Sequence, residues 1–146
     1  MEGRNPRAMG AFRADVARRY GAPPAKVFAA WTDPASASKW LASGGEVVMN
    51  PQVGGLFYVN MVYEGNKYPH YGRYLRVERD RVLEFTWVSE GTKGKESVVT
   101  VTFEPAGSGT KLTLAHEGLP DEENAKSHEG GWTELLEAMA KEFATQ

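Results

Sequence analysis

Large apolar residues near the end of the chain repeat with the period of an α-helix. They occupy positions i, i+3, i+4, i+7, i+8 and i+11, which form one stripe along the helix axis: Trp132, Leu135, Leu136, Met139, Ala140 and Phe143. Charged residues occupy positions between them, so the pattern predicts an amphipathic helix from Glu122 to Phe143. Burial of one large apolar side chain contributes roughly 1.5–3 kcal/mol. We therefore expect the rest of the chain to cover this stripe.

The middle of the chain alternates apolar and polar residues with the two-residue period of β-strands. Together with an earlier alternating segment, this pattern predicts strands at residues 12–20, 46–49, 56–63, 68–78, 82–88, 97–104 and 111–116. The alternation is clearest where Leu83, Phe85 and Trp87 share one face. Glu84 and Thr86 then lie on the opposite face of the same strand.

Glycines predict where these strands turn or approach one another. Gly65-Asn66 marks a tight hairpin. Gly72 suggests a bulge or a close approach, so the inward-facing residues of 56–63 and 68–78 stay undetermined.

Two proline signals predict short helices after the first strand. Pro24 suits a first helical position, where its missing N–H has no partner to lose. Asp33-Pro34 combines an N-cap residue with a second proline of this kind. The predicted order is one strand, two short helices, six strands and a long helix. This is an α+β fold in which an antiparallel sheet of about seven strands curves around the C-terminal helix.

Length and composition define the class of protein. At 146 residues, with 41% hydrophobic and 25% charged residues, the chain fits one globular domain at 11–146 after a polar, disordered tail at 1–10. A net charge of −2 argues against a nucleic-acid partner. The absence of cysteine excludes disulfides and thiolate metal sites. No apolar run is long enough for a membrane span, so we expect no membrane association and a cytoplasmic location.

A set of short motifs resembles one protein family along almost the whole chain. The motifs are Ala22-Pro23-Pro24, Val27-Phe28, Ala30-Trp31-Thr32-Asp33-Pro34, Lys39-Trp40, Gly54-Gly55-x-Phe57, Gly72-x-Tyr74, Leu83-x-Phe85-Thr86-Trp87, Gly109-Thr110-x-Leu112-x-Leu114-x-His116 and Gly131-Trp132. Their order and spacing are similar to those of the activator of heat-shock-protein ATPase homologue family. That family lies within the START/SRPBCC superfamily of polyketide cyclases and birch-pollen-allergen-like proteins.

The resemblance implies a helix-grip fold with a deep apolar cavity between the sheet and the C-terminal helix. It does not imply one reaction, because the superfamily contains carriers, cyclases and aromatases. The leading hypothesis is binding of a small hydrophobic or aromatic ligand by a carrier or sensor, without a cofactor. The alternatives are a cofactor-free cyclase, dehydratase or hydrolase and a module that regulates a chaperone ATPase. An exposed sheet edge would also support a homodimer.

Aromatic residues are the first candidates for a ligand site. Each of them also fits the simpler interpretation that it fills the core. The candidate ligand-binding residues are Trp40, Phe57, Tyr58, Met61, Tyr63, Tyr71, Tyr74, Phe85, Trp87, Leu114, His116, His128, Trp132 and Leu136. Among these, Phe85, Trp87, Leu114 and Trp132 are the best lining candidates, because two strand patterns and the helix stripe converge on them.

The histidines are the candidate acid–base groups. His116 continues the inward pattern of its strand, where it would either hold the following loop or act with a tyrosine as acid and base. His128 lies four residues before Trp132 and would meet the pocket mouth. Together with His70 they are too scattered along the chain to show metal-ligand spacing, so no metal site is predicted.

Gly130-Gly131 is an irregularity within the predicted terminal helix. A glycine destabilises a helix interior by roughly 1 kcal/mol relative to alanine. Two interpretations remain open: close packing against a strand, and a hinge that lets the first helical turns move over a pocket.

Overall fold

The computed structural model describes residues 12–143, and the tail predicted at 1–10 lies outside this range. The strands are β1 (Phe12–Tyr20), β2 (Val47–Met49), β3 (Leu56–Tyr63), β4 (Asn66–Glu78), β5 (Val82–Trp87), β6 (Ser97–Ala106) and β7 (Gly109–Leu119). The helices are α2 (Pro24–Thr32), α3 (Pro34–Trp40) and α4 (Glu122–Ala140), with 3-10 turns η1 (Glu90–Thr92) and η2 (Lys141–Phe143). The predicted order of elements is confirmed.

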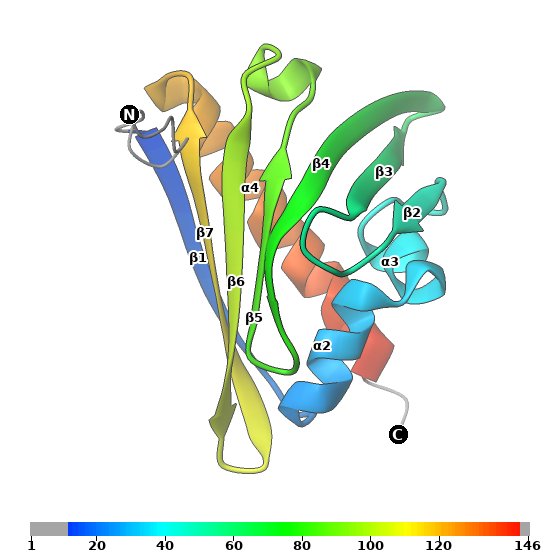
Figure 1. Ribbon diagram of the computed structural model, residues 1–146, viewed down its shortest axis with the longest axis vertical. Coiled ribbons are helices and arrows are strands. Elements are labelled where there is room, and N and C mark those ends of the chain that lie inside the picture. Colours follow the sequence, from blue (N-terminus) through cyan, green and yellow to red (C-terminus); the bar gives the residue numbers. More distant parts are fainter. Residues whose placement is uncertain (1–11, 144–146) are drawn as a thin grey trace.

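The seven strands form one antiparallel sheet in the order β1-β7-β6-β5-β4-β3-β2. Figure 1 shows this sheet curving around α4, with α2 and α3 packed beside the second half of that helix. The first strand therefore pairs with the last one and forms an edge of the sheet that contacts α4. This is the helix-grip arrangement that the sequence predicts.

Capping residues define where two of the helices begin. The Asp33 side chain accepts a hydrogen bond from the Ala35 backbone N–H at 3.1 Å, and Pro34 occupies the first position of α3. The Asp121 side chain accepts one from the Asn124 backbone N–H at 2.7 Å at the start of α4. Such a cap stabilises a helix by about 1 kcal/mol.

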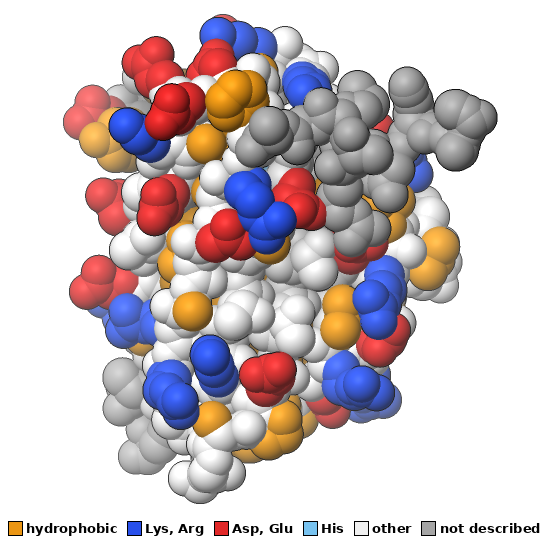
Figure 2. Space-filling model, turned by 90° about the vertical axis from the view of Figure 1, so that its left-hand side faces the viewer, with side chains coloured by type: hydrophobic (Ala, Val, Ile, Leu, Met, Phe, Trp, Pro, Cys, Tyr) orange, Lys and Arg blue, Asp and Glu red, His pale blue; other side chains and the backbone are white. Residues whose placement is uncertain are grey.

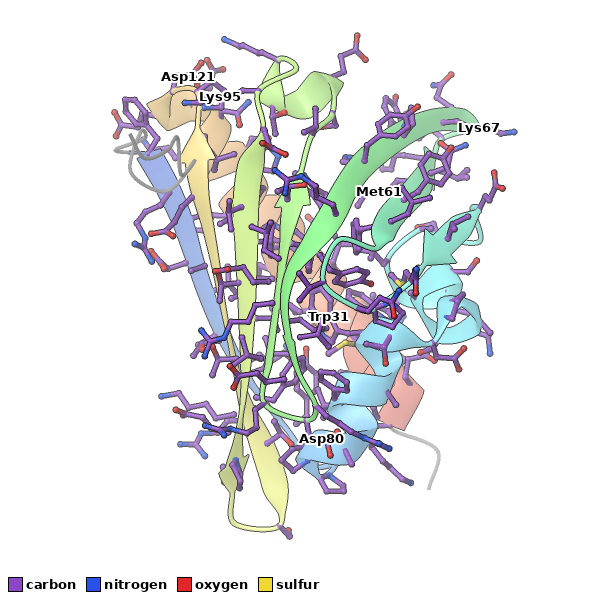
Figure 3. All side chains as sticks on the ribbon, viewed as in Figure 1. Trp31, Met61, Lys67, Asp80, Lys95 and Asp121 are labelled. Atoms are coloured by element: carbon purple, nitrogen blue, oxygen red, sulfur yellow. The ribbon has the colours of Figure 1, made fainter. Side chains whose placement is uncertain are left out.

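The core lies between α4 and the concave face of the sheet. Trp132, Leu136 and Met139 of the helix stripe are buried there. Trp31 is also fully buried, with its ring 4.8 Å from that of Trp40 and 6.1 Å from that of Trp132. Figure 3 shows Trp31 near the middle of the molecule, so α2 and α3 close the lower part of the core.

Gly72 marks the point where β4 changes partner. Its residues up to Arg73 pair with β3, and those from Tyr74 onward pair with β5, while Tyr71 also bridges to Val88 directly after β5. A Cβ atom added at Gly72 would lie 1.9 Å from the Thr86 carbonyl oxygen, which confirms the predicted close approach. The first half of β4 therefore bends away from β5 and carries β3 with it as a separate arm (Figure 1).

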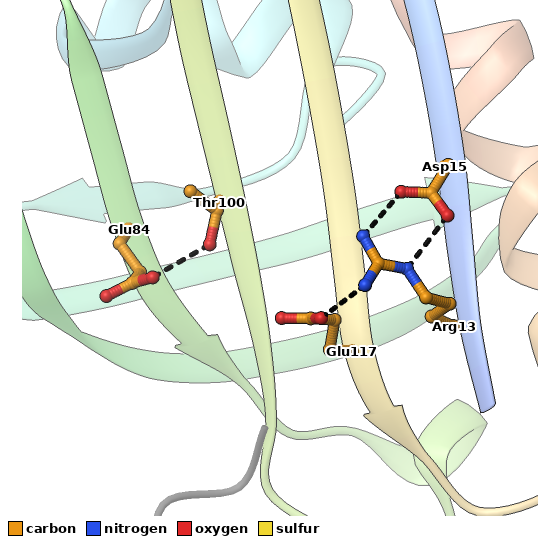
Figure 4. Close-up of polar contacts among 5 residues, drawn as sticks. All are labelled: Arg13, Asp15, Glu84, Thr100 and Glu117. Atoms are coloured by element: carbon orange, nitrogen blue, oxygen red, sulfur yellow. Dashed lines mark hydrogen bonds and ion pairs between the residues drawn. The ribbon is translucent and has the colours of Figure 1, made fainter. Parts of the chain in front are cut away.

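The outer face of the sheet carries ion pairs and hydrogen bonds. The Arg13 guanidinium lies 2.7 Å from a carboxylate oxygen of Asp15 and 2.6 Å from one of Glu117. Figure 4 shows these pairs and the hydrogen bond that Thr100 donates to Glu84 at 2.8 Å. Acidic and basic side chains are interspersed in the view of Figure 2. Such a mixed surface matches the small net charge of the chain.

Two predictions about side-chain positions can be compared with the structure. Glu84 and Thr86 lie on the face opposite Phe85 as predicted, and they are buried there, at 4% and 1% exposed. The interpretation that Gly130 and Gly131 pack closely against a strand is wrong, because a Cβ atom at either position would meet nothing within 4 Å. α4 is assigned as one continuous helix through both glycines.

Candidate ligand-binding cleft

The space beside the β3–β4 arm is an open cleft with a volume of about 970 Å³. The arm forms one wall with residues from 61–63 and 68–71, and α4 forms another with residues from 131–138. The end of α3 and the β5–β6 loop, which contains η1, complete it with residues from 39–43 and 88–94. Met61 and the hairpin-tip residue Lys67 mark this arm in Figure 3. The partner change of β4 at Gly72 thus positions the cleft.

A rigid aromatic core lies directly beneath the cleft. The ring of His70, which lines the cleft, lies 4.6 Å from that of Trp87. Trp87 in turn lies 5.0 Å from Trp132. Phe57 and Phe85 stack at 4.2 Å between their ring centroids. Because these side chains are buried and interlocked, they hold the floor of the cleft in one shape.

Four of the candidates from sequence lie in the cleft wall: Trp40, Met61, Tyr63 and Tyr71. Tyr71 belongs to it only at an edge, since its partner across the strands is Tyr58 and the two rings lie 5.2 Å apart. Tyr58 alternates with buried Phe57, so it lies on the outer face of the arm.

Most other candidates do not line the cleft but fill the core. They are at most 2% exposed: Phe57, Tyr74, Phe85, Trp87, Leu114, His116, Trp132 and Leu136. The two strand patterns and the helix stripe do converge, as the sequence predicts. The residues on which they converge are closely packed, because large rings fill the space between sheet and helix. The open volume lies beside the β3–β4 arm instead.

His116 is held by hydrogen bonds on both ring nitrogens. Trp132 Nε1–H donates to Nδ1 at 3.0 Å, so the proton of the neutral ring resides on Nε2. That nitrogen lies 2.7 Å from Ser97 Oγ, which itself donates to the Trp87 carbonyl oxygen at 2.7 Å. Burial holds the pKa of His116 well below its usual range. His116 therefore joins α4 to the sheet as a neutral, satisfied group.

His128 and His70 complete a cluster with His116 that the sequence does not show. The rings of His116 and His128 lie 4.9 Å apart, and His128 Nδ1 lies 2.9 Å from the Asn124 carbonyl oxygen. Burial lowers the pKa of His128 as well. Within residues 12–143, no group of three or more histidine or carboxylate side chains has an arrangement that could hold a metal ion.

One protein-family model matches nearly all of the chain that the structure describes. The family model described as activator of Hsp90 ATPase homolog 1-like protein matches residues 21–144. The chain belongs to this family. Members of this family lie in the START/SRPBCC superfamily, so the resemblance inferred from the motifs is confirmed.

Known relatives of this family member agree on the fold. CV1439 from Chromobacterium violaceum has 26% sequence identity and a TM-score of 0.79, over 88% of this chain and 94% of its own. PFC0360w, an HSP90 activator from Plasmodium falciparum, has 21% identity and a TM-score of 0.72, over 87% and 92% of the two chains. At that identity the likeness shows the fold alone.

A curated relative is much longer than this chain. The uncharacterized protein C1711.08 of Schizosaccharomyces pombe is 29% identical over 111 residues. This match covers 73% of the present family member but only 30% of the yeast protein.

No helix within residues 12–143 has both the length and the hydrophobicity that crossing a bilayer requires.

Sequence reasoning missed several residues of the cleft in this family member. They are Tyr68 and His70 on β4, the loop residues from Val88 to Gly91, and Leu135 on α4. The turn Glu64-Gly65 is the feature of the sequence that could have placed Tyr68 and His70. Both turn residues have positive φ, as in a two-residue hairpin turn, and this register pairs Met61 with Tyr68.

Proposed function

We propose that this domain binds a small hydrophobic or aromatic molecule in the cleft beside the β3–β4 arm. The observation that carries this proposal is the cleft itself, about 970 Å³ in volume in a domain whose core is otherwise closely packed. Ligand pockets in proteins commonly measure about 300–1,000 Å³ and are mostly apolar. The family also supports a ligand-binding role, since its superfamily contains carriers and cyclases.

The lining indicates what kind of molecule fits. Met61 on β3 and Leu135 on α4 offer apolar surface from two different elements, and Trp40 packs behind the wall. Tyr63 and Tyr68 add exposed phenol rings at the hairpin. The charged lining residues Lys39, Glu90 and Glu134 carry both signs, so the cleft has no strong preference for one charge. A neutral ligand with an aromatic body suits such a lining best.

The two helix glycines provide a matched test. Gly131 lines the cleft, whereas Gly130 does not, and a Cβ atom fits at either position without contact. Leucine also improves helix propensity to a similar degree at both positions. The two variants Gly131→Leu and Gly130→Leu therefore differ chiefly in whether a side chain enters the cleft.

The measurement is fluorescence titration with the neutral hydrophobic dye N-phenyl-1-naphthylamine. We expect saturable one-to-one binding to the unmodified protein and to Gly130→Leu, with at least tenfold weaker binding to Gly131→Leu. Equal affinities of the two variants would place the dye elsewhere. No saturable binding of the dye by the unmodified protein would count against the proposed function.

A second candidate is regulation of a chaperone ATPase, which the family description favours. Apolar side chains on the outer face of β2, β3 and β4 would suit a protein partner: Val48, Leu56 and Tyr71 are 40%, 49% and 52% exposed. The test is the ATPase rate of a purified Hsp90-class chaperone with and without the domain. An unchanged rate at saturating domain concentration would eliminate this candidate.

A further inference from the structure

We propose that His70 makes the cleft selective for aromatic ligands that carry an O–H or N–H donor, such as phenols. This inference rests on the proposed function, because it names the class of ligand for the same cleft. His70 lies on β4 opposite Val59, and its side chain lines the cleft with the Trp87 ring 4.6 Å behind it. The ring is therefore fixed from below and accessible from the cleft.

The contacts of His70 determine which nitrogen carries the proton. His70 Nδ1 lies 2.8 Å from the Tyr68 carbonyl oxygen, which can only accept a hydrogen bond. A neutral imidazole has one N–H, so a ring that donates from Nδ1 keeps Nε2 as an acceptor. His70 thus provides an acceptor nitrogen on a side chain of an otherwise mostly apolar and phenolic wall.

The surroundings keep this ring neutral at physiological pH. Burial lowers the pKa of His70 to about 4 and outweighs the carbonyl groups of Tyr68 and Val59, which favour the charged ring. His128, from α4, disfavours a positive charge on His70 further. At physiological pH the ring is therefore a hydrogen-bond acceptor rather than a cation.

Selectivity follows from the cost of an unpaired acceptor. An aromatic ligand that fills the cleft displaces water from the wall, and a buried acceptor without a partner is unfavourable by about 1–3 kcal/mol. A ligand with a suitably placed O–H or N–H avoids this loss. Converted to affinity, this penalty means that a ligand with such a donor binds about tenfold more tightly than an otherwise equal ligand without a donor.

The test compares 2-naphthol with 2-methoxynaphthalene, which share the ring system but differ in the O–H donor. Isothermal titration calorimetry at pH 7 measures both on the unmodified protein, on His70→Phe and on His70→Gln. We expect the unmodified protein to prefer 2-naphthol about tenfold. His70→Phe should bind both at the affinity of the ether, and His70→Gln, whose amide oxygen accepts, should keep part of the preference.

The outcomes separate this inference from the proposed function. If the unmodified protein binds both compounds equally well, the role of His70 is overturned while ligand binding stands, and this comparison requires no variant. A preference for 2-naphthol that survives in His70→Phe also overturns the role of His70. If neither compound binds, both the inference and the proposed function fail. Tyr68→Phe serves as a control, since loss of the preference there alone would assign the selectivity to the tyrosine hydroxyl.

Discussion

At the scale of single residues, His116 shows how a polar side chain can specify a core. It is fully buried, and its hydrogen bonds reach Trp132 on α4 and Ser97 on β6. A residue in the last strand therefore fixes the rotation of the helix against the sheet. The buried indole N–H of Trp132 depends on His116 for its acceptor, whereas Ser97 also donates to the Trp87 carbonyl oxygen.

We predict that His116→Leu destabilises the protein by about 2–4 kcal/mol, because it leaves the indole N–H of Trp132 buried without an acceptor. Urea denaturation at pH 7 measures the change in unfolding free energy. Ser97→Ala removes the hydrogen bonds with His116 Nε2 and with the Trp87 carbonyl oxygen and should cost about 1–3 kcal/mol, less than the loss of the whole buried imidazole. A loss below 0.5 kcal/mol for His116→Leu, or a loss no larger than that of Ser97→Ala, would contradict the central role of this histidine.

At the scale of elements, Gly72 decides how the sheet is divided. The Thr86 carbonyl occupies the position that a side chain at 72 would need, and Thr86 Oγ1 accepts a hydrogen bond from the Arg73 backbone N–H at 3.0 Å. At position 72, therefore, β4 can approach β5 this closely only because the residue has no Cβ atom. Tyr71 still bridges to Val88 just after β5. From there toward the hairpin the arm separates from β5, and this separation leaves room for the cleft.

We predict that Gly72→Ala destabilises the fold by about 2–4 kcal/mol, since backbone atoms rather than a flexible side chain must move. Chemical denaturation measures this loss, and dye titration should show altered binding because the arm shifts. Gly21→Ala is the matched control, as a Cβ atom there meets nothing within 4 Å. Equal stability of these two alanine variants would show that the strands do not need the glycine.

The elements were predictable from sequence because their signals are local. The strand at 12–20, the helix starts at Pro24 and Pro34 and the helix stripe all appear as predicted. β6 runs on to Ala106 and β7 already begins at Gly109, outside the predicted bounds, because a hairpin continues its ladder up to the turn even where apolar alternation stops. At its other end β7 runs on to Leu119, because it pairs there with Phe12 of β1.

The cleft was less predictable because it depends on contacts between distant segments. The alternation in β5 correctly placed Phe85 and Trp87 inward, but alternation does not distinguish a packed interior from an open one. The inward-facing residues around His70 were left undecided because Gly72 suggested a bulge, whereas the register shift lies between Tyr74 and Arg76. Only the spatial separation of β4 from β5 brings the His70 ring to the cleft, and no local pattern encodes that separation.

At the scale of the whole molecule, the histidine cluster makes stability depend on pH. His70, His116 and His128 lie together between sheet and helix, and burial lowers the pKa of all three. An unfolded histidine has a pKa of about 6.5. Below that pH the unfolded chain binds protons that the folded protein excludes, so stability is complete above about pH 6.5 and falls as the pH falls.

We predict that His70 alone contributes a loss of about 2 kcal/mol between pH 7 and pH 5, because its folded pKa of about 4 lies below this window. The carboxylate of Asp121, whose pKa Lys93 lowers, titrates below the same window and does not disturb the comparison. Urea denaturation at both pH values should therefore show a smaller loss in His70→Phe than in the unmodified protein. An equal loss in the two proteins would mean that His70 takes up its proton in the folded state, and the neutral acceptor required for ligand selectivity would then be absent near pH 5.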